Sequence, residues 1–145
     1  MSGIGAVVVG AALAVTALAA WWLRTKDGGL RPDGGTDVSA SAVLERLGVR
    51  PAEADLTVVQ FSTAFCAPCR TTKARLQQLQ ATRPGLAFVQ VDAESHLDAV
   101  RDLDVRRTPT LFYLGRDGRL IGRSSGAPRP EELTALVDAY AGVRP

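Results

Sequence analysis

Two cysteines, Cys66 and Cys69, are the residues most able to do chemistry in this chain, and they are the only cysteines in its sequence. They follow a short β-rich apolar run that ends at Phe61 and lie where a stretch with helical character begins. A cysteine in the first turn of a helix faces unpaired backbone N–H groups and the positive end of the helix dipole. That environment favours the thiolate, which is the nucleophile in disulfide exchange. The pair is therefore a candidate for redox chemistry.

Two other roles for this spacing are possible, a metal site and a structural disulfide. A structural zinc site needs four ligands. The chain has two Cys and one His, and His96 lies on a different predicted element. A disulfide across two intervening residues closes almost no loop and so removes little chain entropy. These arguments favour a redox-active pair, with no metal and no cofactor besides the disulfide itself.

Composition restricts the class of protein. The 145 residues are 46% hydrophobic and 22% charged, which suits one ordinary domain with an appendage. The net charge is only +2 and the basic residues form no stripe interleaved with aromatic residues, so we expect no nucleic-acid partner. Two cysteines cannot make a multi-disulfide scaffold, and the fold must therefore depend on a hydrophobic core. No oligomer is predicted.

An uncharged run of 20 residues, 4–23, opens the chain. As a helix it would be about 30 Å long, the thickness of a bilayer core, and Trp21 and Trp22 would lie at the headgroup level. A cleaved signal peptide is the alternative, with Ala17-Leu18-Ala19 as the cleavage site. Residues 1–3 contain no Lys or Arg, and the run is longer than a usual signal core of about 7–15 residues. We therefore predict a single-pass membrane anchor over 1–23.

The charges that flank this run predict its orientation. No basic residue precedes it, whereas Arg24, Lys26 and Arg31 follow closely, and the positive-inside rule then puts the rest of the chain in the cytoplasm. An extracytoplasmic domain is the alternative. Residues 24–37 are rich in Gly and polar groups and predict a flexible linker, which leaves 38–145 as the folded domain.

Hydrophobic periodicity predicts alternating helices and strands in this domain. We expect helices at 38–47, 67–82, 97–103 and 130–140, and strands at 56–61, 86–92, 110–114 and 119–124. The β-α-β segments predict parallel pairing, and Asp117-Gly118 predicts an antiparallel hairpin. On the last helix we expect Leu133, Leu136, Val137 and Tyr140 to face inward. The result is an α/β domain, a mixed four-stranded sheet with helices on both faces.

Several motifs occur in an order and at spacings that resemble the thioredoxin family, over roughly 56–140. They are the string TVVQFSTAFCAPCR, the later VDAE, the Thr108-Pro109-Thr110 step, the GRDG hairpin and Gly126. The resemblance implies the thioredoxin fold, with Cys66 as the attacking thiolate, Cys69 as the resolving thiol, and a cis Thr108–Pro109 bond beside the two sulfurs. It also implies a substrate-contacting surface, which would comprise Phe65, Ala67, Pro68, Arg107, Thr108 and Pro109.

Five positions depart from the family pattern, one of them Ala67, where the family has Gly before the Pro. The family's buried Asp is Gln60 here, and its companion Lys is Phe88. Ser62 stands where a Trp usually follows the strand Phe, and Phe65 replaces the Trp before the first cysteine. A carboxylate can take a proton from the resolving thiol, whereas an amide has no comparable basicity. We therefore predict that Cys69 is deprotonated by water or substrate and that the second exchange step is slow.

The functional expectation is a membrane-tethered thiol–disulfide oxidoreductase that acts on protein disulfides. With the domain in the cytoplasm the favoured direction is reduction, with electrons from an unidentified donor such as a thioredoxin-reductase-like protein or a low-molecular-weight thiol. Positive charge from Arg107 and Arg70 would lower the pKa of the Cys66 thiol if it lies near the sulfur; the alternative is that both are ordinary exposed arginines. The alternative is a non-catalytic binding module that keeps the thioredoxin shape as a scaffold, because fold alone does not establish function.

Overall fold

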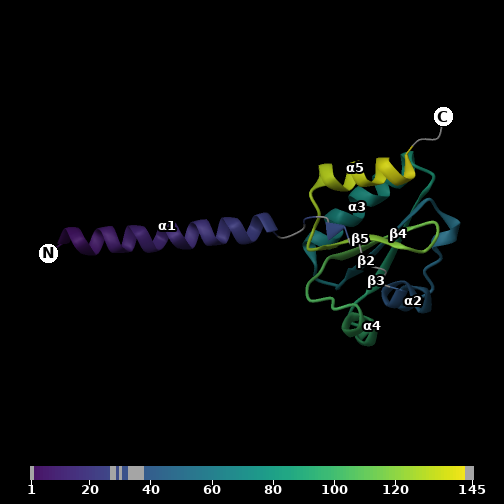
Figure 1. The fold of residues 1–145 in the computed structure, drawn as a ribbon, viewed down its shortest axis with the longest axis horizontal. Helices are drawn as coiled ribbons and strands as arrows, with labels where there is room; N and C mark the ends of the chain where they lie inside the picture. The colour runs from purple at the N-terminus through teal and green to yellow at the C-terminus, as the bar shows by residue number, and fades with distance from the viewer. Residues whose placement is uncertain (1, 27–28, 30, 33–37, 143–145) are drawn as a thin grey trace.

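The computed structural model describes residues 2–26, 29, 31–32 and 38–142 of the chain, and Figure 1 shows their arrangement. The strands form one mixed sheet in the order β1-β5-β4-β2-β3. The two-residue β1 covers Arg31–Pro32, and the longer strands are β2 (Leu56–Ser62), β3 (Leu86–Asp92), β4 (Thr110–Gly115) and β5 (Leu120–Ser125). The predicted mixed sheet of four strands is confirmed. β1 was not predicted, because two residues carry no periodic signal.

Strand pairing follows the predicted connections. β2 and β3 are parallel and are joined through helix α3 (Ala67–Thr82), whereas β4 lies antiparallel to both β2 and β5. Between β4 and β5 the chain reverses at Gly118, whose φ of +77° lies in the left-handed region that glycine adopts without strain. This topology places β2, the strand that leads into the cysteines, in the interior of the sheet.

Helices cover both faces of the sheet (Figure 1). α3 and α5 (Pro130–Ala141) lie on one face, and α2 (Val38–Arg46) and α4 (Leu97–Asp102) lie on the other. Side chains of β2 alternate between the two. Leu56 and Val58 belong to the core under α3 and α5, whereas Val59 and Phe61 belong to the core under α2 and α4. A short 3₁₀ turn, Pro51–Glu53, leads into β2.

One predicted inward position on α5 is wrong. Tyr140 is half exposed at 49%, whereas Leu133, Val137 and Ala141 are buried. These three residues are four positions apart and lie on one helical face, so Tyr140 falls at the margin of that stripe. The sequence pattern predicts which residues recur on one side of the helix, but contact with the sheet determines how many of them are buried.

The N-terminal helix α1 extends over Ser2–Lys26. Within the described part of the chain, no helix is both long enough and apolar enough to cross a membrane. This finding contradicts the predicted single-pass anchor over residues 4–23 and the membrane localisation and cytoplasmic orientation inferred from it. The physical reason is composition: much of the run is Ala and Gly, whose small side chains gain little free energy on leaving water. The length of the run, its lack of charge and the two tryptophans at its end had suggested a span.

The predicted linker, 24–37, lies only partly within the described residues. Helix α1 includes positions 24–26, β1 accounts for 31–32, and positions 27–28, 30 and 33–37 lie outside the described residues. β1 pairs with β5, where Arg31 is opposite Arg123 and Pro32 is opposite Gly122. Part of the predicted linker is therefore paired with the edge of the sheet.

A buried tyrosine predicts how stability depends on pH. Tyr113 is fully buried, and its hydroxyl shares a hydrogen bond of 2.8 Å with that of Ser124. Burial raises the pKa of Tyr113 well above its ordinary value. A tyrosine in the unfolded chain loses its proton near pH 10, whereas the buried one keeps it. The unfolded state therefore binds fewer protons, and the free energy of unfolding should fall by up to about 1.4 kcal/mol per pH unit above about pH 10.

Denaturant unfolding of the parent chain and of Tyr113→Phe between about pH 9 and pH 11 checks this expectation. The variant should be less stable at neutral pH, because the Ser124 hydroxyl loses its partner, and it should show the smaller decline at high pH. Equal declines in the two proteins would contradict the assignment to Tyr113.

Candidate active site

The two cysteines lie where β2 gives way to α3. β2 ends at Ser62, Cys66 is the N-cap residue of α3, and Cys69 is in the first turn. The two are joined as a disulfide, with their Cα atoms 5.2 Å apart. The predicted strand-to-helix junction is confirmed. The pair is thus held between a central strand and a long helix.

Backbone geometry explains why the helix starts at this point. Cys66 is extended, with φ −89° and ψ 98°, and its sulfur accepts a hydrogen bond of 3.2 Å from the backbone N–H of Cys69. Pro68 lies in the first turn, where its missing N–H leaves no helical hydrogen bond unmade. The Cys66 sulfur therefore occupies the position at the helix N-terminus where negative charge is stabilised.

The two cysteine residues are both buried, Cys69 more completely than Cys66. Cys69 is 2% exposed and Cys66 8% exposed. The residues that flank Cys66 are open to solvent: Ala67 and Pro68 are exposed, and Phe65 is 96% exposed. A large aromatic side chain in water beside the cysteines offers apolar contact area to a partner.

The loop before β4 lies at the same end of the sheet as the cysteines. Thr110, the first residue of β4, pairs with Phe61 near the end of β2. The Thr108–Pro109 bond is cis, as predicted, Pro109 is buried, and Thr108 is partly exposed. The Pro109 carbonyl accepts a 2.8 Å hydrogen bond from the Gly126 N–H, which ties the loop to the end of β5.

Arg107 immediately precedes this loop. It is exposed, and its carbonyl oxygen accepts a 2.6 Å hydrogen bond from the hydroxyl of Thr110. The contact orders the backbone around the cis bond without using the guanidinium group. The expected effect of the Arg107 charge on the Cys66 thiol stays a prediction.

Gln60, which the sequence marks as a departure from the family pattern, makes a contact with the cysteine pair that was not predicted. The side chain is fully buried, and its Nε2 donates a 3.0 Å hydrogen bond to the carbonyl oxygen of Cys69. Its Oε1 is buried and has no hydrogen-bond partner among the described residues. The signal in the sequence was one amide within an apolar strand, LTVVQF, which indicates a buried polar group that needs a partner.

Nothing in the described part of the chain groups three or more His, Cys, Asp or Glu side chains that could hold a metal ion. The ring of His96 lies at the exposed start of α4, where Nδ1 is 3.0 Å from the carbonyl oxygen of Asp92. His96 therefore belongs to the turn after β3 and not to the cysteine site.

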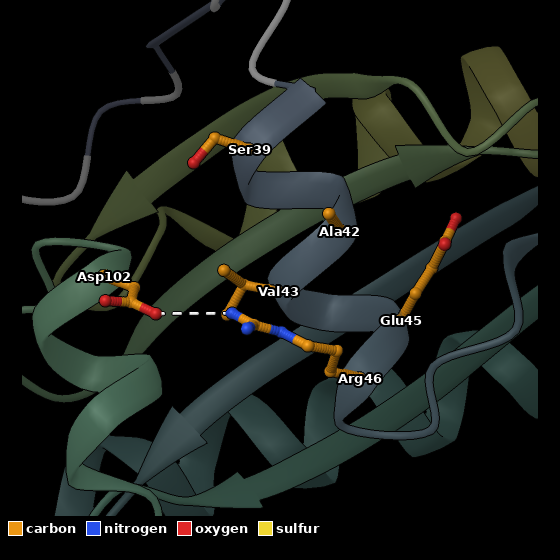
Figure 2. A pocket seen from close by; sticks show the side chains of 6 residues that line it. All are labelled: Ser39, Ala42, Val43, Glu45, Arg46 and Asp102. Carbon is orange, nitrogen blue, oxygen red and sulfur yellow. Dashed lines mark hydrogen bonds and ion pairs between the residues drawn. The ribbon is translucent and has the colours of Figure 1, made fainter.

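A hollow of about 840 Å³ lies over α2 and α4, and Figure 2 shows its lining. Arg46 of α2 reaches across it to Asp102 of α4, with an N–O distance of 3.3 Å. The lining residues are Ser39, Ala42, Val43, Glu45, Arg46 and Asp102. They lie on the face of the sheet opposite α3, and none of them is a predicted site residue. The hollow is separate from the cysteines.

Comparison with known proteins agrees with this geometry. A sequence model of the thioredoxin family matches residues 48–139. Thioredoxin H4-1 of Oryza sativa subsp. japonica is 31% identical over 87 residues, which cover 58% of this chain and 66% of the relative. Thioredoxin of Mus musculus is 34% identical over 86 residues, 59% of this chain and 80% of the relative.

A solved structure shows the same fold. The X-ray structure of Fasciola hepatica thioredoxin superposes with a TM-score of 0.57 at 28% identity, and the match covers 69% of this chain and 93% of that one. By contrast, the match with the rice relative covers just under two thirds of that relative's length.

Proposed function

The chain belongs to the thioredoxin family of thiol–disulfide oxidoreductases, and we propose that it exchanges disulfides with protein substrates through Cys66 as nucleophile and Cys69 as resolving thiol. One observation carries the proposal: the Cys66 sulfur caps α3 and accepts the Cys69 N–H. In the reduced protein the same N–H group and the helix dipole stabilise a thiolate at Cys66.

The exchange runs in two steps. The Cys66 thiolate attacks one sulfur of a substrate disulfide, an enzyme–substrate disulfide forms, and the other substrate sulfur leaves as a thiolate that takes up a proton. The Cys69 thiol then loses its proton and attacks Cys66. The substrate leaves with two thiols, and the enzyme keeps the Cys66–Cys69 disulfide, which is the state present in the structure.

We place the substrate on the exposed surface around the pair. Phe65, Ala67 and Pro68 project from the cysteine loop, and the loop that holds Thr108 and Pro109 lies at the same end of the sheet. The backbone of an extended substrate segment would contact Thr108, and Phe65 would supply apolar area. The exposed Arg107 would favour acidic partners.

For the direction of exchange we propose reduction of protein disulfides, with a reductase or a low-molecular-weight thiol as donor. The proposed direction depends on the family relationship alone. A cytoplasmic orientation would also have supported it, but that orientation was inferred from the predicted membrane anchor, which is contradicted. We also propose that the folded unit covers 38–145, which contains the matched residues 48–139.

Turnover of a protein disulfide tests the function. The full-length chain with excess dithiothreitol should reduce a protein disulfide well above the rate of dithiothreitol alone. Cys66→Ser should fall to that background, because no thiolate is left at the helix N-terminus. The control is Ser39→Ala, which lies in the separate hollow over α2 and should keep the parent rate.

Equal rates for the parent chain and Cys66→Ser would reject catalysis and favour the alternative, a binding module that keeps the fold as a scaffold. Binding of the same substrate to the oxidised chain then measures that second role directly.

A further inference from the structure

The two polar atoms of the Gln60 side-chain amide differ in their contacts at the redox site. It lies in the middle of β2, paired with Leu111 of β4 and Gln90 of β3, and it is completely buried. Its Nε2 donates to the carbonyl oxygen of Cys69 at 3.0 Å. Its Oε1, the other end of the same amide, is buried with no hydrogen-bond partner within the described chain.

The orientation of this amide follows from its surroundings. A backbone carbonyl can only accept, so the end of the Gln60 amide that faces the Cys69 carbonyl must be the nitrogen. Oε1 is then the end without a partner. An unpaired buried acceptor destabilises the state that contains it, and native proteins leave few such groups.

The redox state of Cys69 changes what this oxygen can meet. In the disulfide the Cys69 sulfur carries no hydrogen and cannot donate. Reduction gives Cys69 an S–H group, a weak donor, at a residue that is 2% exposed and already joined to the Gln60 amide through its carbonyl. Only the reduced protein therefore offers Oε1 a donor from Cys69.

The packing places the Gln60 side chain and Cys69 on the same side of the sheet. Side chains alternate along β2, so Gln60 shares a face with Leu56 and Val58, which pack in the core with Leu76 and Leu79 of α3. Cys69 is a buried residue of the same helix. The sulfur of Cys69 thus lies on the helix that covers the Gln60 face of the sheet.

We propose that Gln60 is a positioning residue that accepts a hydrogen bond from the Cys69 thiol in the reduced protein. The inference rests on the proposed function, whose redox equilibrium it concerns. This bond forms in one redox state only, so Gln60 shifts the Cys66–Cys69 couple toward the dithiol. It also holds the proton on Cys69, while the helix N-terminus favours loss of the proton from Cys66.

The equilibrium involved is reduction by glutathione. Two glutathione thiols give up two electrons and two protons and become one glutathione disulfide, while the Cys66–Cys69 bond breaks and each sulfur takes up a proton. The bond from Nε2 to the Cys69 carbonyl is seen in the disulfide form and does not involve the sulfur, so we expect it in both redox states and expect its loss to affect both alike. The acceptor Oε1 acts on the reduced state alone, so a change in the potential reports on Oε1.

The first experiment measures this potential in the full-length chain. Gln60→Met keeps an unbranched side chain of similar size without the amide. We expect the equilibrium constant in glutathione buffers to move about tenfold toward the disulfide, which lowers the reduction potential by about 30 mV. Gln78→Met, on the exposed surface of α3, is the matched control and should keep the parent potential. An unchanged or higher potential in Gln60→Met would overturn the proposal.

The second experiment leaves Gln60 in place. In Cys66→Ser the single thiol is Cys69, and its S–H stretch in the infrared reports hydrogen bonding directly. We expect a band lowered in frequency compared with a free thiol, whereas a band at the free-thiol position would reject the bond. This measurement leaves Gln60 unchanged and so stays decisive if Gln60→Met fails to fold.

Both measurements are independent of substrate turnover. A potential that shifts as expected in a chain without turnover would reject the proposed function and keep the role of Gln60. Turnover together with an unshifted potential would reject the role of Gln60 and keep the proposed function.

Discussion

Replacing Cys69 with serine is expected to turn the chain into a covalent trap for its substrates. Cys66 can still attack a substrate disulfide, but the variant has no second thiol that could displace the bound substrate from Cys66. In the structure the two cysteines form a disulfide with their Cα atoms 5.2 Å apart, so the resolving attack is intramolecular. Intramolecular reactions of this kind have very large effective concentrations, and release should slow by at least about a thousand-fold.

Non-reducing electrophoresis and mass spectrometry of the full-length chain, mixed with a disulfide-bonded protein, measure the trapped species. Cys69→Ser should accumulate it, and the double variant Cys66→Ser/Cys69→Ser should form none. If Cys66→Ser traps substrate better than Cys69→Ser, then the two roles are reversed. The greater exposure of Cys66, 8% against 2% for Cys69, favours the order given.

Phe61→Ala is expected to cause the largest loss of stability, about 3–5 kcal/mol in the free energy of unfolding. Phe61 is completely buried in β2 and packs edge to face on Phe112 of β4, with ring centroids 5.7 Å apart at 73°. The guanidinium of Arg123 lies 4.9 Å from the centre of the Phe112 ring. Truncation leaves a cavity between two interior strands and α2, which they cannot readily close.

Phe65 supplies the matched control, because it is the same residue type four positions later and is 96% exposed. Phe65→Ala should change the free energy of unfolding by no more than about 0.5 kcal/mol. It should instead raise the KM for a protein disulfide, since the proposed substrate-contacting surface loses apolar area. Urea denaturation compares the two variants. A loss below about 1 kcal/mol for Phe61→Ala would contradict the packing argument. If this variant does not fold, Phe61→Leu should show a smaller loss in the same direction.

Much of the fold could be predicted because local signals agreed with one another. The helix at 67–82 and the strand at 86–92 have the predicted bounds: Pro68 suits a first helical turn, and Pro84-Gly85 ends the helix. The hairpin at Gly118 followed from turn chemistry. These signals depend on neighbouring residues, which sequence shows directly.

Errors arose where the outcome depends on residues far apart or on total free energy. Tyr140 has the right helical spacing but falls outside the area that the sheet covers. Strand β1 exists through its pairing with β5, about 90 positions later, and has no local pattern. The run at 4–23 has the length of a membrane span, but the described helix lacks the apolar character that a span requires.

The sequence by itself determined the reactive pair and its place at a strand-to-helix junction, because the spacing of Cys66 and Cys69 and the position of Pro68 are local facts. Only the tertiary structure decided what surrounds that pair. It brings Gln60, nine positions earlier, against the Cys69 carbonyl. The cis Thr108–Pro109 bond was already implied by the family resemblance, and the structure confirms it at the same end of the sheet. These contacts depend on strand register and on which face each side chain occupies, and both are settled by burial across the whole sheet.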